Sequence, residues 1–180
     1  MNLMERVKAI LLSPKTEWTV VESETGDASY LLTNYVAILA AIPAVSSFVG
    51  YSMLGLSLSR TLLFAIFSYV FYCLAWYVEA YVIDMLAPTF GGRRDLQSAL
   101  KLSAYSSTAA WLAGIFHIVP ALGILGILGL YSLYLLWTGV PVLMKVPRDR
   151  VLGYVASVVA IMIVIMVVVT ALLAMMLRPW

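Results

Sequence analysis

The chain has 180 residues, of which 63% are hydrophobic and only 11% are charged, and its formal net charge is +2. Soluble domains carry about 25% charged residues, so this composition, with a mean hydropathy of +1.00, excludes a soluble globular protein and indicates one that crosses a membrane several times. The small net charge gives no indication of a nucleic-acid partner, and we expect none.

Residues 1–29 are predicted to form a cytoplasmic, amphipathic segment. The dipeptide Ser13-Pro14 is typical of a helix start, so two short helices are expected at the membrane interface. Trp18 is a candidate anchor at the level of the lipid headgroups, or a contact for a partner. The acidic residues of the second helix indicate either a solvated face or a docking surface for a cytosolic protein. The apolar residues of the first helix recur at helical spacing and are Leu3, Val7, Ile10 and Leu11.

Residues 30–180 are predicted to form one all-α membrane domain of five spans. Each apolar stretch has about the 17–25 residues that a helix needs to cross the hydrocarbon core. The two-residue alternation of a membrane β-barrel is absent from these stretches. The expected spans are about 30–49, 61–86, 103–119, 122–144 and 152–177.

The basic residues indicate how the spans are oriented. Cytoplasmic loops of membrane proteins are enriched in Lys and Arg. A cytoplasmic N-terminus places nine of the eleven basic residues on the cytoplasmic side and leaves Arg60 and Arg178, with the C-terminus, on the opposite side. The nine are Arg6, Lys8, Lys15, Arg93, Arg94, Lys101, Lys145, Arg148 and Arg150.

Two acidic residues fall within the second span. Ionisable residues inside a membrane are costly and are functional candidates by default. Asp84 lies within a turn of the cytoplasmic end, whereas Glu79 is about two turns deep, or roughly 10 Å at 1.5 Å per residue. Because their positions differ by about 140° around an ideal helix, the two acids are not expected to form one paired-carboxylate site.

Several hydroxyl and amide side chains are expected at the same inner level as Glu79. They predict either a polar cavity open toward the cytoplasm or a set of interhelical hydrogen bonds, each worth about 0.6 kcal/mol. In the first case Glu79 and the hydroxyl run 106–108 form the relay of a small transporter or proton-coupled channel. In the second case Glu79 is structural. The side chains are Asn34, Tyr35, Ser103, Tyr105, Ser106, Ser107, Thr108, Tyr154 and Ser157.

The cytoplasmic connectors carry the candidate contacts to lipid headgroups or to a partner. The turn Gly91-Gly92 is either a flexible link to two orienting arginines or a phosphate site that combines backbone amides with guanidinium groups. Asp95 is a favourable N-cap for a helix that starts at Leu96. The basic candidates in these connectors are Arg93, Arg94, Lys145, Arg148 and Arg150.

Three glycines in the fourth span, Gly123, Gly126 and Gly129, recur at three-residue spacing. Small residues at such spacing allow another helix backbone to approach closely. The neighbouring helix belongs either to this chain or to a second copy of it, so the stripe leaves the oligomeric state open.

No combination of residues predicts a catalytic or metal site. His117 is the single histidine and Cys73 the single cysteine, which excludes a histidine-cluster metal site and an intramolecular disulfide. The sequence has no phosphate-binding glycine loop after a strand and no zinc spacing. We therefore expect no enzymatic activity, no cofactor and no metal.

Two parts of the sequence carry a family pattern. The first is Ile-Leu-Leu-Ser-Pro at 10–14, followed by Trp18 and Glu22. The second is Ala-Leu-Lys-Leu-Ser-Ala-Tyr-Ser-Ser-Thr-Ala-Ala-Trp-Leu-Ala-Gly-Ile-Phe at 99–116, which continues to Pro120, Gly-Leu-Tyr-Ser-Leu-Tyr at 129–134, Gly139-Val140-Pro141, Pro147 and Gly153-Tyr154. With these stretches most of the chain resembles the prokaryotic branch of the Yip family.

The resemblance implies five spans, a cytoplasmic N-terminus and a C-terminus on the opposite side. Yip proteins are named for interaction with Ypt/Rab GTPases. The Asp-Leu-Tyr-Gly-Pro motif of eukaryotic members is absent here and the N-terminal region is reduced to residues 1–29, so Rab binding is not implied.

The leading hypothesis is a non-enzymatic inner-membrane protein that acts in membrane organisation, or as an adaptor, through its cytoplasmic face. Its expected partners are anionic lipid headgroups, and a protein partner or a second copy of the chain. The alternative hypothesis is the transporter or channel that uses Glu79.

Overall fold

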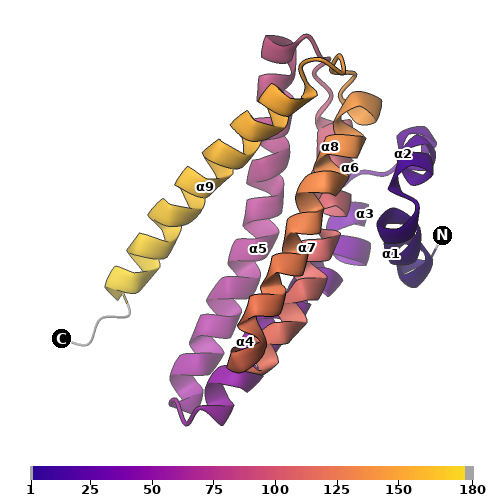
Figure 1. Ribbon diagram of the computed structural model, residues 1–180. Helices are drawn as coiled ribbons and strands as arrows, with labels where there is room; N and C mark the ends of the chain where they lie inside the picture. Colours follow the sequence, from indigo (N-terminus) through magenta and orange to yellow (C-terminus); the bar gives the residue numbers. More distant parts are fainter. Residues whose placement is uncertain (1, 177–180) are drawn as a thin grey trace.

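The structure is a computed structural model that describes residues 2–176, and all regular structure in this range is helical (Figure 1). The all-α prediction is confirmed for these residues. Arg178 and the end of the fifth expected span, at 177, lie outside them. The α-helices are α1 (Leu3–Leu12), α2 (Pro14–Ser23), α3 (Ala28–Leu31), α4 (Ala37–Met53), α5 (Leu58–Leu86), α6 (Leu96–Ser106), α7 (Thr108–Ala113), α8 (Tyr131–Leu143) and α9 (Val151–Met176). A π-helical turn covers Leu32–Val36, and 3₁₀ segments cover Ala87–Phe90, Gly114–Ile118 and Pro120–Leu130.

Local sequence signals set several helix starts. At α1, Asn2 and Glu5 form a reciprocal capping box, in which the Asn2 side chain accepts from the Glu5 backbone N–H at 2.9 Å. Pro14 opens α2 as predicted. Asp95 caps α6 by accepting from two backbone N–H groups of its first turn, which confirms the prediction of a helix that begins at Leu96.

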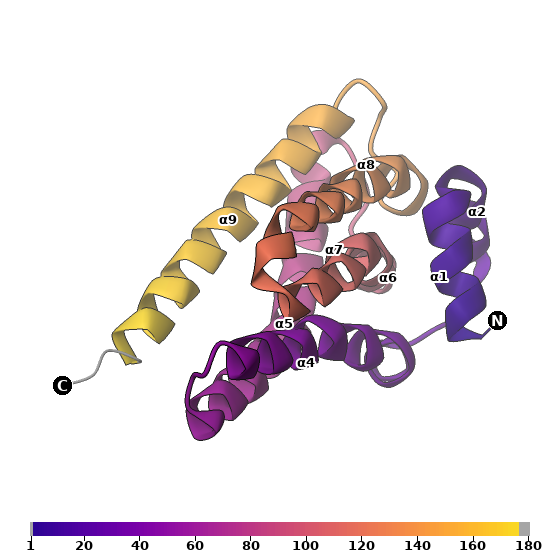
Figure 2. The same cartoon turned by 60° about the horizontal axis from the view of Figure 1, so that its bottom comes forward.

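Helices α1 and α2 pack against the bundle instead of exposing their apolar faces. Figure 2 shows the pair on the side of the bundle opposite to α9. Val7, Ile10 and Val21 are buried. Trp18 is 0% exposed, and its indole N–H donates to the Thr138 hydroxyl of α8 at 3.0 Å. Trp18, which the sequence assigned to the lipid headgroups, therefore contacts protein, as do these apolar residues of α1 and α2.

A glycine makes room for this indole. A Cβ atom at Gly139 would lie 2.7 Å from the Trp18 ring and 2.5 Å from Leu102, distances that side chains do not tolerate. Because α8 has no side chain at this position, the ring of Trp18 fits between α8 and α6. This packing is the physical reason why Trp18 is buried.

Helix α6 lies at the centre of the bundle. Every residue from Ala99 to Ser106 is buried, and α6 packs against α5, α8 and α3. Polar side chains are expensive in hydrocarbon. In this stretch α6 carries Lys101 and three residues with hydroxyl groups. It therefore suits a central position, where neighbouring helices supply hydrogen-bond partners for these side chains.

Four segments of the described residues are long and apolar enough to cross a membrane: Ala28–Met53, Leu58–Phe90, Ala121–Leu143 and Val151–Val169. They correspond to the first, second, fourth and fifth expected spans. The third expected span, 103–119, is not among them, because it belongs to the more polar helical stretch 96–118, whose α-helical structure is interrupted at Ser107. Length and composition therefore support four of the five expected spans.

Helix α9 contacts the rest of the chain through its first half. Val151, Tyr154 and Val158 are buried there. Further along, Ile163 and Val167 are more than half exposed, and the helix diverges from α5 and α8 in both views (Figure 1, Figure 2).

Close helix approaches use glycines other than the predicted stripe. A Cβ atom at Gly123 or Gly126 would meet nothing within 4 Å, and one at Gly129 would come within 3.3 Å of α7. The tightest approaches between α4 and the 3₁₀ segment Gly114–Ile118 are instead at Gly50, where a Cβ would clash with the His117 carbonyl, and at Gly114, where a Cβ would clash with the Pro43 side chain. Packing of Gly123 and Gly126 against a second copy stays a prediction.

We expect Trp18→Ala to release α1 and α2 from the bundle. Removal of a buried tryptophan side chain costs about 3–5 kcal/mol, and the variant also leaves Thr138 without its donor. In detergent-solubilised protein, cleavage of the linker 24–27 by a nonspecific protease should accelerate. Val20→Ala changes an exposed position of the same helix and serves as the control. Equal cleavage rates in the two variants would contradict the docking.

Candidate functional site

The first polar cluster lies where α1 and α2 meet α6. The buried guanidinium group of Arg6 donates to the carboxylates of Glu17 and Glu24. The same group lies 5.3 Å from the ring centroid of Tyr105, which is a cation–π distance. A buried charge is costly unless it is paired, so these contacts stabilise Arg6 and hold α1 against α2.

Lys101 of α6 completes this cluster. Its buried ammonium group donates to the main-chain carbonyls of Val21, at 3.0 Å, and of Glu24. The last carbonyls of a helix have no intrahelical donor, and the helix dipole favours a cation at this end. Lys101, which sequence analysis used only to orient the chain, thus caps α2 and ties it to the central helix.

Two predicted site residues, Tyr105 and Thr108, meet at Tyr35 of the first span. The hydroxyl groups of Tyr35 and Thr108 lie 2.6 Å apart. The rings of Tyr35 and Tyr105 pack edge to face with centroids 4.7 Å apart, and Trp18 contacts Tyr105 from another side. These contacts join the N-terminal helices, α6 and the first span.

A cavity of about 630 Å³ opens beside this cluster. Its lining includes Arg6, Lys101, Glu24, Tyr105 and the predicted site residue Asn34. The two cations are already bound by carboxylates and carbonyls of the chain. The cavity therefore presents polar surface but no free charge, and it is a consequence of how α1 and α2 dock.

The second polar cluster is built around Glu79 of α5. Its Oε2 atom accepts from the Ser103 hydroxyl at 2.7 Å and from the Ser107 hydroxyl at 3.4 Å. Close by, the Trp76 indole N–H donates to the Leu100 carbonyl at 3.1 Å. Glu79 therefore bonds to two serines of the 103–107 turn, while Thr108 bonds to Tyr35 elsewhere.

Glu79 lines a mainly apolar groove of about 330 Å³ between α5, α8 and α9, together with Ser106 and Ser107. The groove is not the cavity open toward the cytoplasm that sequence analysis considered. One turn further along α5, Ile83 is 0% exposed, as is Tyr154 of α9, and the Tyr154 hydroxyl donates to the Ile83 carbonyl. Tyr154 thus blocks that route and does not line it.

Asp84 lies apart from Glu79 and has a different partner. Its Oδ2 atom accepts from two nitrogens of Arg94, Nε at 2.9 Å and Nη2 at 2.7 Å. Arg94, predicted as a headgroup contact, is therefore engaged by the protein, although 58% of its side chain is exposed. Neither acid belongs to a group that could hold a metal ion, and residues 2–176 contain no such group of three or more His, Cys, Asp or Glu.

The turn before α6 does not offer its amides to a phosphate. The N–H groups of Gly91 and Gly92 donate to carbonyls of the 3₁₀ turn Ala87–Phe90, and that of Arg93 donates to the Met144 carbonyl at 2.9 Å. The phosphate-binding interpretation of this turn is wrong for its backbone, because these donors are already used. The Arg93 bond instead ties the two connectors together.

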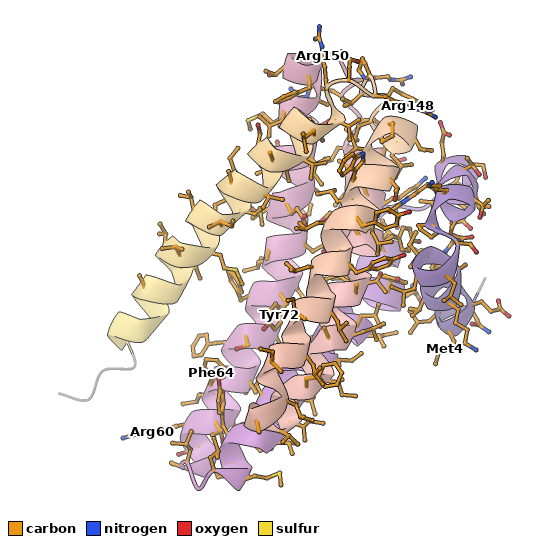
Figure 3. All side chains as sticks on the ribbon, in the orientation of Figure 1. Met4, Arg60, Phe64, Tyr72, Arg148 and Arg150 are labelled. Carbon is orange, nitrogen blue, oxygen red and sulfur yellow. The ribbon has the colours of Figure 1, made fainter. Side chains whose placement is uncertain are left out.

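The third polar region is the basic end of the bundle. Figure 3 places Arg148 and Arg150 at this end and Arg60 at the other. Lys145 pairs with Glu22 of α2, and Arg150 lies 4.0 Å from Asp149. The carboxylates of the chain thus occupy part of the predicted headgroup contacts.

Arg148 has no ion-pair partner in the described part of the chain and lines a groove of about 720 Å³. Lys15 of α2, which also has none there, lines the same groove, and Trp137, Pro141 and Val142 of α8 form its apolar wall. We call this the basic-end groove. Neither Lys15 nor Trp137 was predicted as a site residue, although a tryptophan near the end of a span is typical of a membrane interface.

One serine–histidine contact was also missed. Ser47 Oγ and His117 Nδ1 lie 3.4 Å apart, at the end of the bundle away from the basic residues. A catalytic pair needs a third group that orients the base, and His117 has no carboxylate partner within residues 2–176. The contact therefore does not form a catalytic triad.

Comparisons with known proteins agree on one family. A family model described as the Yip1 domain matches residues 8–169. The chain is 25% identical over 172 residues to "Inner membrane protein YohC" of Escherichia coli K12, with 88% of each chain covered, and equally similar to the protein of that name from E. coli O6:H1. No solved structure matches significantly. The resemblance inferred from residues 10–22 and 99–154 is confirmed.

We expect Lys101→Met to loosen α2 while the bundle remains folded. The variant keeps an unbranched side chain but leaves the carbonyls of Val21 and Glu24, at the end of α2, without this donor. An unsatisfied buried carbonyl costs about 1–3 kcal/mol. Hydrogen exchange of the α2 amides should accelerate. Lys8→Met, at an exposed position of α1, should leave that exchange unchanged, and the same result for Lys101→Met would exclude the capping role.

Proposed function

The chain belongs to the Yip1 domain family, and from that premise we propose that it is a non-enzymatic protein of the inner membrane that binds anionic lipid at its cytoplasmic face and thereby contributes to membrane organisation. The observation that carries the proposal is the basic-end groove, where Lys15 and Arg148 flank an apolar wall. The name of the similar E. coli protein supports the choice of membrane.

The proposal includes five spans, with the stretch 96–118 as the third. At 1.5 Å per residue this stretch is about 35 Å long, enough for a hydrocarbon core of about 30 Å. The polar residues in its middle, Lys101, Ser103, Ser106 and Thr108, are buried, so neighbouring helices shield them from lipid. The position of Arg60 opposite to Arg148 and Arg150 supports a cytoplasmic N-terminus and a C-terminus on the other side (Figure 3).

The chemistry of the basic-end groove suits a phospholipid with a negatively charged headgroup. Lys15 and Arg148 supply two cations, each worth about 1 kcal/mol near an anionic surface. Trp137 is 50% exposed and, with Pro141 and Val142, offers an apolar surface to the acyl chains. A zwitterionic lipid can occupy the same wall but gains less from the cations.

We expect phosphatidylglycerol to raise the thermal stability of the detergent-purified protein more than phosphatidylcholine does. A ligand that binds only the folded protein stabilises it by about 2.7 kcal/mol at one hundred times its dissociation constant. The double variant Lys15→Gln, Arg148→Gln should lose the difference between the two lipids, because it removes both cations and keeps the wall.

Arg60→Gln, at the opposite end of the bundle, is the matched control and should behave as the parent protein. Equal stabilisation by the two lipids would overturn the proposal, as would a difference that survives in the double variant. If a cytosolic protein is instead retained by the parent and lost by the double variant, independently of lipid, the adaptor role replaces the lipid role.

The second candidate function is a small transporter or proton-coupled channel. The observation that favours it is the carboxyl of Glu79 beside the Ser103 and Ser107 hydroxyls at membrane depth. The closed contact between Ile83 and Tyr154 weighs against it, because a transport path needs access from the cytoplasm.

Proton flux into protein-containing liposomes tests this second candidate. We expect no flux above protein-free liposomes for the parent or for Glu79→Gln. A flux in the parent that disappears in Glu79→Gln would establish transport and exclude lipid binding as the sole role.

A further inference from the structure

One oxygen of the Glu79 carboxyl is not bound by the chain. Oε2 accepts from two serines, whereas no donor of residues 2–176 lies within hydrogen-bonding distance of Oε1. These residues contain no fully buried side-chain oxygen or nitrogen without a partner, so Oε1 is accessible. Since Glu79 lines the groove between α5, α8 and α9, that groove is the space from which a donor can reach it.

The groove has the composition of a site for an apolar molecule with one polar end. Phe71 and Tyr72 of α5, Leu136 of α8 and Met162 of α9 form its walls. Glu79 is the only acid in its lining, and no lysine, arginine or histidine of the described residues lines it. Its volume of about 330 Å³ lies within the usual range for small-molecule sites, about 300–1,000 Å³.

The route into the groove is from the side. Ile83 and Tyr154 close it toward the cytoplasmic end. Beyond Val158, α9 diverges from α5 and α8 (Figure 2) and Ile163 is 55% exposed. A ligand therefore enters from the hydrocarbon phase, which requires a lipophilic molecule.

We propose that this groove binds a lipophilic amine, with its ammonium group at Glu79 Oε1 and its hydrocarbon chain along α9. An ammonium group supplies both the missing donor and a positive charge opposite the carboxyl, and a hydrogen bond between charged groups is about twice as strong as one between neutral groups. An alcohol supplies a donor without the charge, and a fatty acid adds a second negative group.

Dodecylamine is the probe. Binding of the radiolabelled amine to the protein in nanodiscs is measured against empty nanodiscs, which corrects for partition into lipid. We expect saturable binding of one molecule per chain and weaker binding of dodecanol and dodecanoic acid. Glu79→Gln should weaken binding of the amine by about tenfold or more, because it replaces the ion pair by a hydrogen bond from the ammonium group to an uncharged amide.

Two further variants separate the binding from folding. Asp84→Asn changes the other acid of α5, which lies outside the groove, and should leave amine binding unchanged. Ala75→Phe fills the groove one turn from Glu79. It should weaken binding of the amine, although the Glu79 carboxyl is still present. The variant Lys15→Gln, Arg148→Gln should retain amine binding, so that failure of this inference and failure of the lipid proposal are distinguishable.

Three results would overturn the inference. They are the absence of saturable binding above empty nanodiscs, equal amine affinity in the parent and Glu79→Gln, and equal affinity of the parent for dodecanol and dodecylamine. The last result would show that the groove selects the hydrocarbon chain alone.

Discussion

A polar helix inside a membrane bundle has to find its hydrogen-bond partners in protein, and α6 is such a helix. Lys101 and Ser103 lie in its buried stretch. The carbonyls at the end of α2 bind Lys101, and Glu79 of α5 binds Ser103. The N-terminal helices and Glu79 in the second span thus have the same role, since each supplies hydrogen-bond partners to the polar central helix.

The basic side chains near the basic end of the bundle fall into two groups. Arg6, Arg94 and Lys145 are paired with acids of the chain and hold elements together. Lys15 and Arg148 are left without such partners among residues 2–176, on the rim of the basic-end groove. Lys8 and Arg93 also lack an ion-pair partner in this range but lie outside the groove, so Lys15 and Arg148 are the cations that the groove offers to a ligand.

Local signals predicted the local features, and distant contacts decided the rest. Asp95 could be placed from its neighbours alone, because N-capping is a short-range interaction. The burial of Trp18 could not be predicted from its neighbours, since it depends on the space left by Gly139 of α8, far along the chain. The depth of Glu79 predicted that serines would bond to it, but only the fold selects Ser103 and Ser107 as its partners and assigns Thr108 to Tyr35.

The arrangement of the whole bundle depends most on the docking of α1 and α2, in which α2 packs against α8 and Lys101 of α6 caps its end. Hydrogen–deuterium exchange of the parent protein in nanodiscs tests it directly. The account predicts that the amides of α2 exchange slowly, at rates near those of α6, because Trp18 and Lys101 hold α2 against the bundle. Exchange of α2 as fast as that of the linker 24–27 would contradict it.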